Sequence, residues 1–273
     1  MSEKEKLCSI EIIILTKIQI IKITPISLKK TNIIKLTIFP VLFLFCFCKL
    51  NILTAESLLE KSIQAHGGKK LLNQFKSIQY NKSTKLYSEN GELEKHLLQK
   101  ITQQWDPFLS SMEWKNLEGY FIAKKEFGEV SLILDNKEIK DSLKLIETES
   151  NLNAAFYVFW QPFQLLEPDA KKVFLGREKI LDSIEVLAMK VTYSDKVGAD
   201  IWHYFFDPKN FKIRAVKVEH RGRTSLIVNE LYETKTGLSL NKSRKSYFLD
   251  SLGKVNYLRA AYEYEISSFD YKK

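Results

Sequence analysis

From Val173 to the C-terminus, short segments in which apolar and polar residues alternate follow one another. Alternation with a period of two is typical of β-strands that bury one face, and short turns between such strands impose antiparallel pairing. Turn-forming residues separate the segments, among them Gly198 and Gly222. A chain with so many consecutive strands must build a large sheet, which twists and curls. The predicted strands cover residues 173–180, 185–193, 201–206, 213–220, 225–232, 242–248 and 256–266.

Residues 77–134 follow the same pattern nearer the N-terminus. Alternation between Ile78 and Leu86 predicts a strand, and Glu89-Asn90-Gly91 predicts a tight hairpin. The return segment over residues 92–105 fits both strand and helix patterns. We interpret it as a strand because the Asn-Gly turn pairs it with its predecessor. Further short strands are expected up to residues 130–134.

Helical patterns occur in three places. An apolar stripe over residues 56–65 predicts a helix that stops at His66-Gly67-Gly68, because glycine readily adopts the left-handed conformation of a helix end. A short helical piece is expected over residues 70–75, and a longer block over residues 137–166, in which Pro162 ends or kinks the helix. The predicted fold class is therefore α+β, with a large curved antiparallel sheet whose apolar concave face is covered by helices.

The N-terminal residues 1–55 have the character of an export signal. Lys29, Lys30 and Lys35 precede an uncharged run over residues 36–48, and Ala55 offers a small residue at a cleavage position. That run is too short for an ordinary transmembrane helix, which needs about 20 apolar residues, but it suits the hydrophobic region of a signal peptide. We therefore expect a signal peptide with an atypically long N-terminal extension over residues 1–55, and a single mature domain over residues 56–273.

The positions of the cysteines and of the basic residues exclude further kinds of site and partner for the mature domain. All three cysteines, Cys8, Cys46 and Cys48, lie before residue 55, so the mature domain is expected to have no disulfide, thiol nucleophile or Cys-bound metal. A retained membrane anchor and acylation at Cys46 or Cys48 stay open as alternatives to cleavage. Much of the net charge of +9 comes from residues 1–55, which carry eight Lys and three Glu. No basic run interleaved with aromatic residues follows, and nucleic-acid binding is not expected.

Residues for catalysis or metal binding form no recognisable pattern. The four histidines, His66, His96, His203 and His220, are scattered without the spacing of metal ligands. No Gly-x-Ser-x-Gly turn and no phosphate-binding glycine loop occurs in the sequence. We expect no catalytic residue, no metal site and no cofactor.

Aromatic residues make up 12% of the chain, and their positions indicate where an apolar interior lies. Residues 154–166 form the most apolar stretch after residue 55, and a second aromatic group lies on the predicted strand over residues 201–206. We expect both groups to face one interior, where they either pack as a core or line a ligand cavity. The candidate ligand-binding residues are Phe156, Phe159, Trp160, Phe163, Leu166, Trp202 and Tyr204.

Four segments carry a resemblance to a known group of proteins. They are AHGG at residues 65–68, FYVFWQPFQLL at 156–166, DIWHYFFD at 200–207 and YLRAAYEY at 257–264. Residues 56–273 resemble the outer-membrane lipoprotein-sorting and carrier proteins of the LolA/LolB-like superfamily, and within it an uncharacterised family of envelope proteins of the Bacteroidetes type. The resemblance implies a half-open antiparallel barrel with helices as a lid over a cavity for acyl chains, and no catalytic residues.

The sequence thus predicts an exported protein of the periplasm or cell envelope that binds an apolar ligand, such as an acyl chain or a lipoprotein-like ligand, without catalysis. We expect a monomer, with association to the inner or outer membrane left open. Two alternatives remain. A small-molecule hydrolase using the same cavity would show His203 beside a carboxylate and a hydroxyl, and a packed envelope interaction protein would show no cavity.

Overall fold

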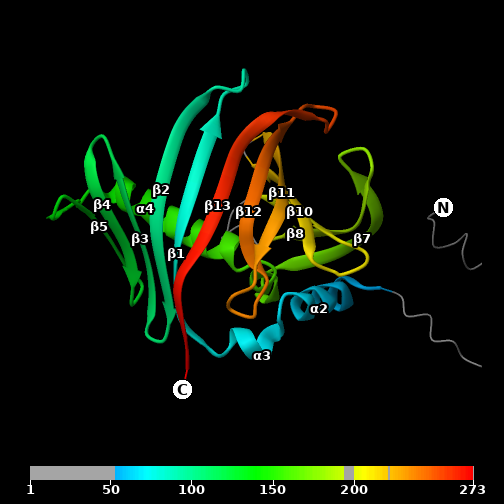
Figure 1. Ribbon diagram of the computed structural model, residues 1–273, viewed down its shortest axis with the longest axis horizontal. Coiled ribbons are helices and arrows are strands. Elements are labelled where there is room, and N and C mark those ends of the chain that lie inside the picture. The colour runs from blue at the N-terminus through cyan, green and yellow to red at the C-terminus, as the bar shows by residue number, and fades with distance from the viewer. Residues whose placement is uncertain (1–52, 194–199, 221, 273) are drawn as a thin grey trace, which may run out of the picture. The chain divides into compact units, whose positions relative to one another are not determined.

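One antiparallel sheet of thirteen strands organises the described part of the chain (Figure 1). The computed structural model describes residues 53–193, 200–220 and 222–272, all within the compact unit Asn51–Lys273. The strand order is β6-β5-β4-β3-β2-β1-β13-β12-β11-β10-β9-β8-β7. The sheet is curved and unclosed, so the predicted α+β half-barrel is confirmed. Residues 1–52 of the predicted signal peptide (residues 1–55) and the predicted turn at Gly198 lie outside the described residues.

Two meanders meet at the centre of the sheet. Strands β1 to β6 run from the centre to one edge, and β7 to β13 run from the opposite edge back to the centre, where β13 pairs with β1. The chain must therefore cross the sheet once, between β6 and β7. The strands are β1 (Phe75–Tyr87), β2 (Leu93–Trp105), β3 (Phe108–Asn116), β4 (Gly119–Glu126), β5 (Glu129–Leu134), β6 (Lys137–Glu138), β7 (Lys171–Ile180), β8 (Ile184–Thr192), β9 (Ile201–Phe206), β10 (Ile213–His220), β11 (Arg223–Glu233), β12 (Leu240–Leu249) and β13 (Val255–Tyr271).

The helix α4 (Ser142–Phe159) makes that crossing and passes behind β1 and β13 in Figure 1. Asp141 caps its N-terminus by accepting a hydrogen bond from the Lys144 N–H at 2.9 Å. The helix ends before Pro162, as predicted, and a short 3-10 helix, η1 (Phe163–Leu166), follows. The predicted helical block over residues 137–166 was too long at its start, because residues 137 and 138 pair with β5 as strand β6.

The strand predictions for the hairpin and the last strand are confirmed. β2 pairs with β1 along its length after a turn in which Gly91 has a φ of 84°. In β13, Ala260, Tyr264 and Ile266 are buried on the inner face, at 1%, 5% and 7% exposure. Glu263 lies between them on the outer face, as the alternation requires.

The helices α2 (Ala55–Ala65) and α3 (Gly68–Leu72) lie together at one end of the sheet. The predicted stop at residues 66–68 is confirmed, and Gly67 takes a φ of 110° there. A Cβ at this position would lie 2.6 Å from Leu238 Cδ2, so only glycine fits. The second helix was predicted over residues 70–75 but ends at Leu72, because Phe75 is already paired with Tyr271 of β13.

Buried apolar side chains form two clusters on opposite faces of the sheet. The larger one lies on the inner face and includes Tyr80, Phe159, Trp160 and Tyr204. The smaller one, on the outer face of β8 to β11, contains Phe205. Both faces of the β8–β11 half are therefore partly covered, while the inner face of the β1–β5 half packs mainly against α4.

Candidate functional site

A cavity of about 680 Å³ lies between α4 and the inner face of the sheet. Its wall contains residues from both meanders, from β1 to β5 and from β9 to β13, together with one side of α4. Pockets that hold small molecules usually enclose about 300–1,000 Å³. The volume between the helix and the curved sheet is thus sufficient for a ligand.

Most of the wall is apolar. Met112, Phe121, Ala123, Leu132 and Leu152 are almost fully buried, yet each borders the cavity. A lining of this kind favours the apolar part of a ligand, because surface is removed from water on both sides of the contact. The polar residues of the wall include Lys82, Gln99, Thr148, Arg244, Ser246, Tyr262 and Tyr264.

The two ends of α4 differ in their contacts with the rest of the protein. At the N-terminal end, Leu143 and Ile146 are 76% and 65% exposed. At the C-terminal end, Phe159 and Trp160 are 0% and 1% exposed, and the indole N–H of Trp160 donates a hydrogen bond to Gln103 of β2. The helix is therefore fixed to the sheet at its C-terminal end, and the cavity lies under the part before it.

The candidate ligand-binding residues lie mainly in the core next to the cavity. Phe159, Trp160, Phe163 and Tyr204 are buried, and Phe156 and Leu166 are half-buried and packed against the same cluster. The structure places the rings of Phe156 and Phe159 each against Trp160. Trp202 alone among the seven borders the cavity.

All of the α4 residues that border the cavity were missed by sequence reasoning, among them Thr148, Leu152 and Ala155. These three residues lie three to four residues apart and so share one side of the helix. That spacing is visible in the sequence, but the aromatic residues that follow it form a stronger apolar signal. Phe159 and Trp160 are instead buried in the core, where such large side chains gain most from burial.

A hydrogen-bonded group of tyrosines joins the end of α4 to β9 and to the residue that follows β8. The hydroxyl of Tyr157 lies 2.6 Å from the hydroxyls of both Tyr193 and Tyr204, and Gln161 Nε2 donates to the Tyr204 hydroxyl at 3.0 Å. Burial raises the pKa of each of these tyrosines far above its ordinary value. They stay protonated near neutral pH, so the group serves as a structural link.

His203 faces away from the cavity. It alternates with Trp202 on β9, and its ring Nδ1 lies 3.9 Å from Glu219 Oε1 on the outer face. Burial lowers its pKa, with the nearby Lys217 acting in the same direction. The cluster that a hydrolase would require is therefore not in the cavity wall among the described residues.

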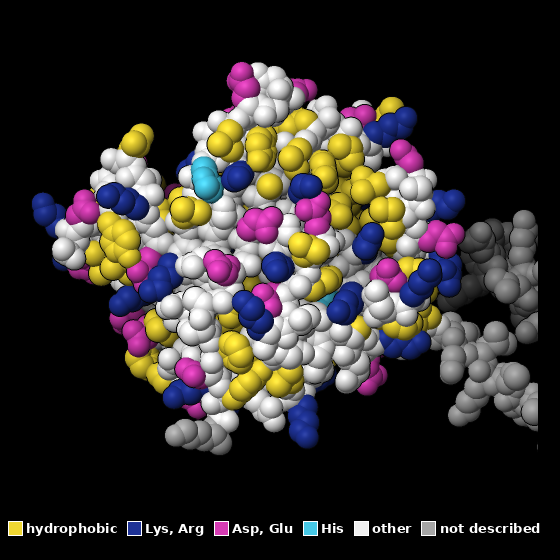
Figure 2. Space-filling view, viewed as in Figure 1, with side chains coloured by type: hydrophobic (Ala, Val, Ile, Leu, Met, Phe, Trp, Pro, Cys, Tyr) yellow, Lys and Arg dark blue, Asp and Glu magenta, His cyan; other side chains and the backbone are white. Residues whose placement is uncertain are grey.

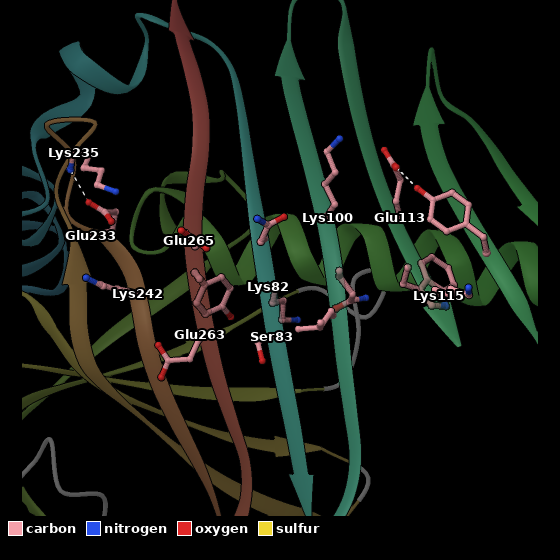
Figure 3. A pocket seen from close by; sticks show the side chains of 16 residues that line it. Lys82, Ser83, Lys100, Glu113, Lys115, Glu233, Lys235, Lys242, Glu263 and Glu265 are labelled. Carbon is pink, nitrogen blue, oxygen red and sulfur yellow. Dashed lines mark hydrogen bonds between the residues drawn. The ribbon is translucent and has the colours of Figure 1, made fainter. Parts of the chain in front are cut away.

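A groove of about 700 Å³ lies on the outer face, with α4 behind the sheet in the view of Figure 3. Several of its charges are held by neighbours. Glu233 accepts hydrogen bonds from the backbone N–H groups of Thr234 and Lys235 at 2.8 Å, and Glu263 accepts one from Ser243 at 2.8 Å. Figure 2 shows acidic and basic side chains close together at the centre of this face. Charged residues of both signs line this groove, so it lacks the uniform charge that would indicate a charged ligand.

The described residues, 53–193, 200–220 and 222–272, contain neither a cluster of metal ligands nor a helix that could span a membrane. No three or more His, Cys, Asp or Glu side chains among them are placed to hold a metal ion. None of the helices in this part of the chain has the length and apolar character needed to span a bilayer.

Comparison with solved structures defines the class of fold. The LolA superfamily protein NE2245 from Nitrosomonas europaea matches over 81% of this chain and 95% of its own, with a TM-score of 0.52 and 12% sequence identity. The lipoprotein LppX from Mycobacterium tuberculosis matches over 79% of this chain and 96% of its own, with 10% identity and a TM-score of only 0.29. The fold is that of the LolA superfamily, as the sequence resemblance predicted.

The family is defined by sequence. The chain belongs to the family of unknown function DUF6503, whose family model matches residues 35–224. The match includes the cavity-facing part of α4 and ends at the start of β11. No curated protein sequence is significantly similar to this chain.

Proposed function

We propose that this protein is exported to the cell envelope and binds an apolar ligand, an acyl chain or a lipid-like molecule, without catalysing a reaction. The observation that carries the proposal is the cavity of about 680 Å³ beneath α4, with its largely apolar wall. The apolar part of this wall would remove surface of a bound chain from water, which is what a carrier of apolar molecules must do.

The chemistry of the wall supports binding rather than catalysis. Its hydroxyl groups include those of Thr148, Ser225 and Ser246, and no histidine borders the cavity within the described residues. Among the residues that the structure describes, the carboxylates in the lining are Glu118 and Glu147, both exposed. A serine or threonine needs an adjacent base to act as a nucleophile, so the hydrolase alternative has no support here.

The proposed location rests on the N-terminal segment, residues 1–55, with its basic, apolar and small residues in the order of an export signal. We propose that the mature domain acts as a monomer in the periplasm or cell envelope. Association with a membrane surface would give such a carrier access to its ligand.

Displacement of a fluorescent apolar probe tests the proposed function. The full chain, titrated with 1-N-phenylnaphthylamine, should increase the probe's fluorescence with one binding site per chain, and hexadecanol should reverse the increase. The heat-denatured chain serves as the control. A folded protein that neither enhances the probe nor binds hexadecanol would defeat the proposal in favour of a packed interaction protein.

A further inference from the structure

Two basic side chains face the cavity from strands on either side of β13. Lys82 of β1 lies opposite Tyr264, and Arg244 of β12 lies opposite Tyr262. Both side chains border the cavity; Lys82 is half-buried and also lines the outer groove of Figure 3, whereas Arg244 is only 3% exposed. Because Tyr262 and Tyr264 are two residues apart on the same face of β13, the two cations lie near each other at the middle of the inner face.

Neither cation has a carboxylate partner among residues 53–193, 200–220 and 222–272, where no Asp or Glu oxygen lies within 4.0 Å of either one. Arg244 Nε donates a hydrogen bond to Asn229 Oδ1 at 2.8 Å, and Lys82 Nζ lies 5.5 Å from the ring centroid of Tyr262. These contacts leave both positive charges without a counter-ion. A buried charge without one is costly, which is why such charges are normally paired.

Burial and the neighbouring Arg244 lower the pKa of Lys82 to about 8, so its ammonium group is still mainly charged at neutral pH. The charged residues at the rim of the cavity do not compensate the positive charge of Lys82. Lys95, Lys144, Glu118 and Glu147 are all exposed and contribute equal numbers of each sign. The interior thus keeps a positive charge inside an apolar wall.

We propose that the cavity binds an anionic amphiphile, whose carboxylate or phosphate group is held between Lys82 and Arg244 while its acyl chain lies along the apolar wall. This inference rests on the proposed function and specifies its ligand class. A bound acid would supply the missing counter-ion through charge-assisted hydrogen bonds, which are the strongest that a protein makes. The apolar part of the same cavity wall includes Leu97 of β2, Met112 of β3 and Phe121 of β4.

Competition against the same fluorescent probe tests the inference in the full chain. The competitors are hexadecanoate, hexadecyl phosphate, the neutral hexadecanol and inorganic phosphate. We expect either acid to bind at least about tenfold more tightly than hexadecanol, since hydrogen bonds to a charged group are stronger than those to a neutral hydroxyl. Inorganic phosphate at the same concentrations should not displace the probe, because it has no chain to place on the apolar wall.

Substitutions of Lys82 test whether its charge causes the preference for the acids over hexadecanol. Lys82→Met should bring the acids to within about threefold of hexadecanol, and Lys82→Arg should keep most of the wild-type preference. Lys85→Met is the matched control, because Lys85 is exposed on the outer face of the same strand.

Four outcomes would overturn the inference. Equal binding of hexadecanoate and hexadecanol to the wild-type protein would remove the anion site while leaving the apolar cavity, and this comparison needs no variant to fold. An unchanged preference for the acids over hexadecanol in Lys82→Met would also rule out the anion site. Displacement by inorganic phosphate at the concentration of hexadecyl phosphate would show that the chain is not recognised. If the probe does not bind at all, the proposed function itself fails.

Discussion

The phenol ring of Tyr80 on β1 is stacked on the ring of Phe159 at the end of α4, with 3.9 Å between the ring centroids and 9° between the planes. This contact joins the crossing helix to the strand at the centre of the sheet, where the two meanders meet. It lies at the C-terminal end of α4, so the remainder of the helix spans the cavity. One contact thus separates the part of the inner face that is filled by side chains from the part that is not.

Trp160→Ala should destabilise the fold by about 3–5 kcal/mol, because a large buried side chain is removed from a packed environment. Trp160 is 1% exposed and lies against Phe75 and Trp105, with ring centroids 5.6 and 4.7 Å away. Urea denaturation of both proteins measures the difference. Leu117→Ala, at a fully exposed position, is the control and should change stability by less than about 0.5 kcal/mol. A loss of less than about 1 kcal/mol for Trp160→Ala would contradict its placement in the core.

His66 makes the fold less stable in mild acid. The side chain is fully buried, its Nδ1 lies 2.8 Å from Ser62 O, and burial lowers its pKa from 6.5 to about 4. Between these pKa values the unfolded chain binds a proton that the folded chain does not, so the free energy of unfolding falls as the pH falls through this window. The contribution of His66 should decrease by about 2 kcal/mol between pH 7.5 and pH 5.

Comparing wild type with His66→Asn isolates that effect, since the other titrating groups are common to both proteins. Asn can still donate to Ser62 O but does not titrate. We expect the stability difference between the two proteins to shrink at pH 5 in urea denaturation. A difference that is the same at both pH values would show that His66 does not titrate as proposed.

The residue at which the mature chain begins determines whether α2 keeps its N-terminal cap. Thr54 caps this helix, accepting a hydrogen bond from the Ser57 N–H at 3.2 Å, and Leu53 packs against the core. Cleavage after Ala55, as the sequence predicted, would remove both residues. A chain that begins at Glu56 should be about 1–2 kcal/mol less stable than one that begins at Asn51.

Denaturation of the two chains measures this loss, and Thr54→Ala in the longer chain should reproduce about 1 kcal/mol of it. Equal stabilities would show that the cap is unimportant. N-terminal sequencing of protein from the cell envelope would then establish which of the two starts occurs, and an intact N-terminus on protein found in the cytosol would refute export.

Local patterns in the sequence predicted most of the strands. The Asn90-Gly91 turn and the alternation in β13 each reflect interactions between residues close in sequence, so they could be recognised without the structure. The pairing of β1 with β13 could not be, because it joins residues such as Tyr80 and Ile266 that have no common local signal. That pairing determines which residues face the cavity together.

The same limit applied to the candidate site. The aromatic content of residues 156–166 made several of them candidate ligand-binding residues. Only the packing of α4 on the sheet decides which of them border a cavity. Lys82 is one of many lysines in the sequence, and nothing around it is unusual. Its significance depends on Arg244, which the β1–β13–β12 order brings near it.

The central claim, that the cavity beneath α4 holds an acyl ligand, is tested most directly by native mass spectrometry of the protein isolated from its own cells. The wild-type protein should carry a bound species with the mass of an acyl-chain amphiphile. Ala155→Trp should lose it, because Ala155 borders the cavity and the larger side chain would fill it. Ser150→Trp, at an exposed position on α4, should retain it. Wild-type protein without any bound mass, or a ligand retained equally in Ala155→Trp, would contradict the account.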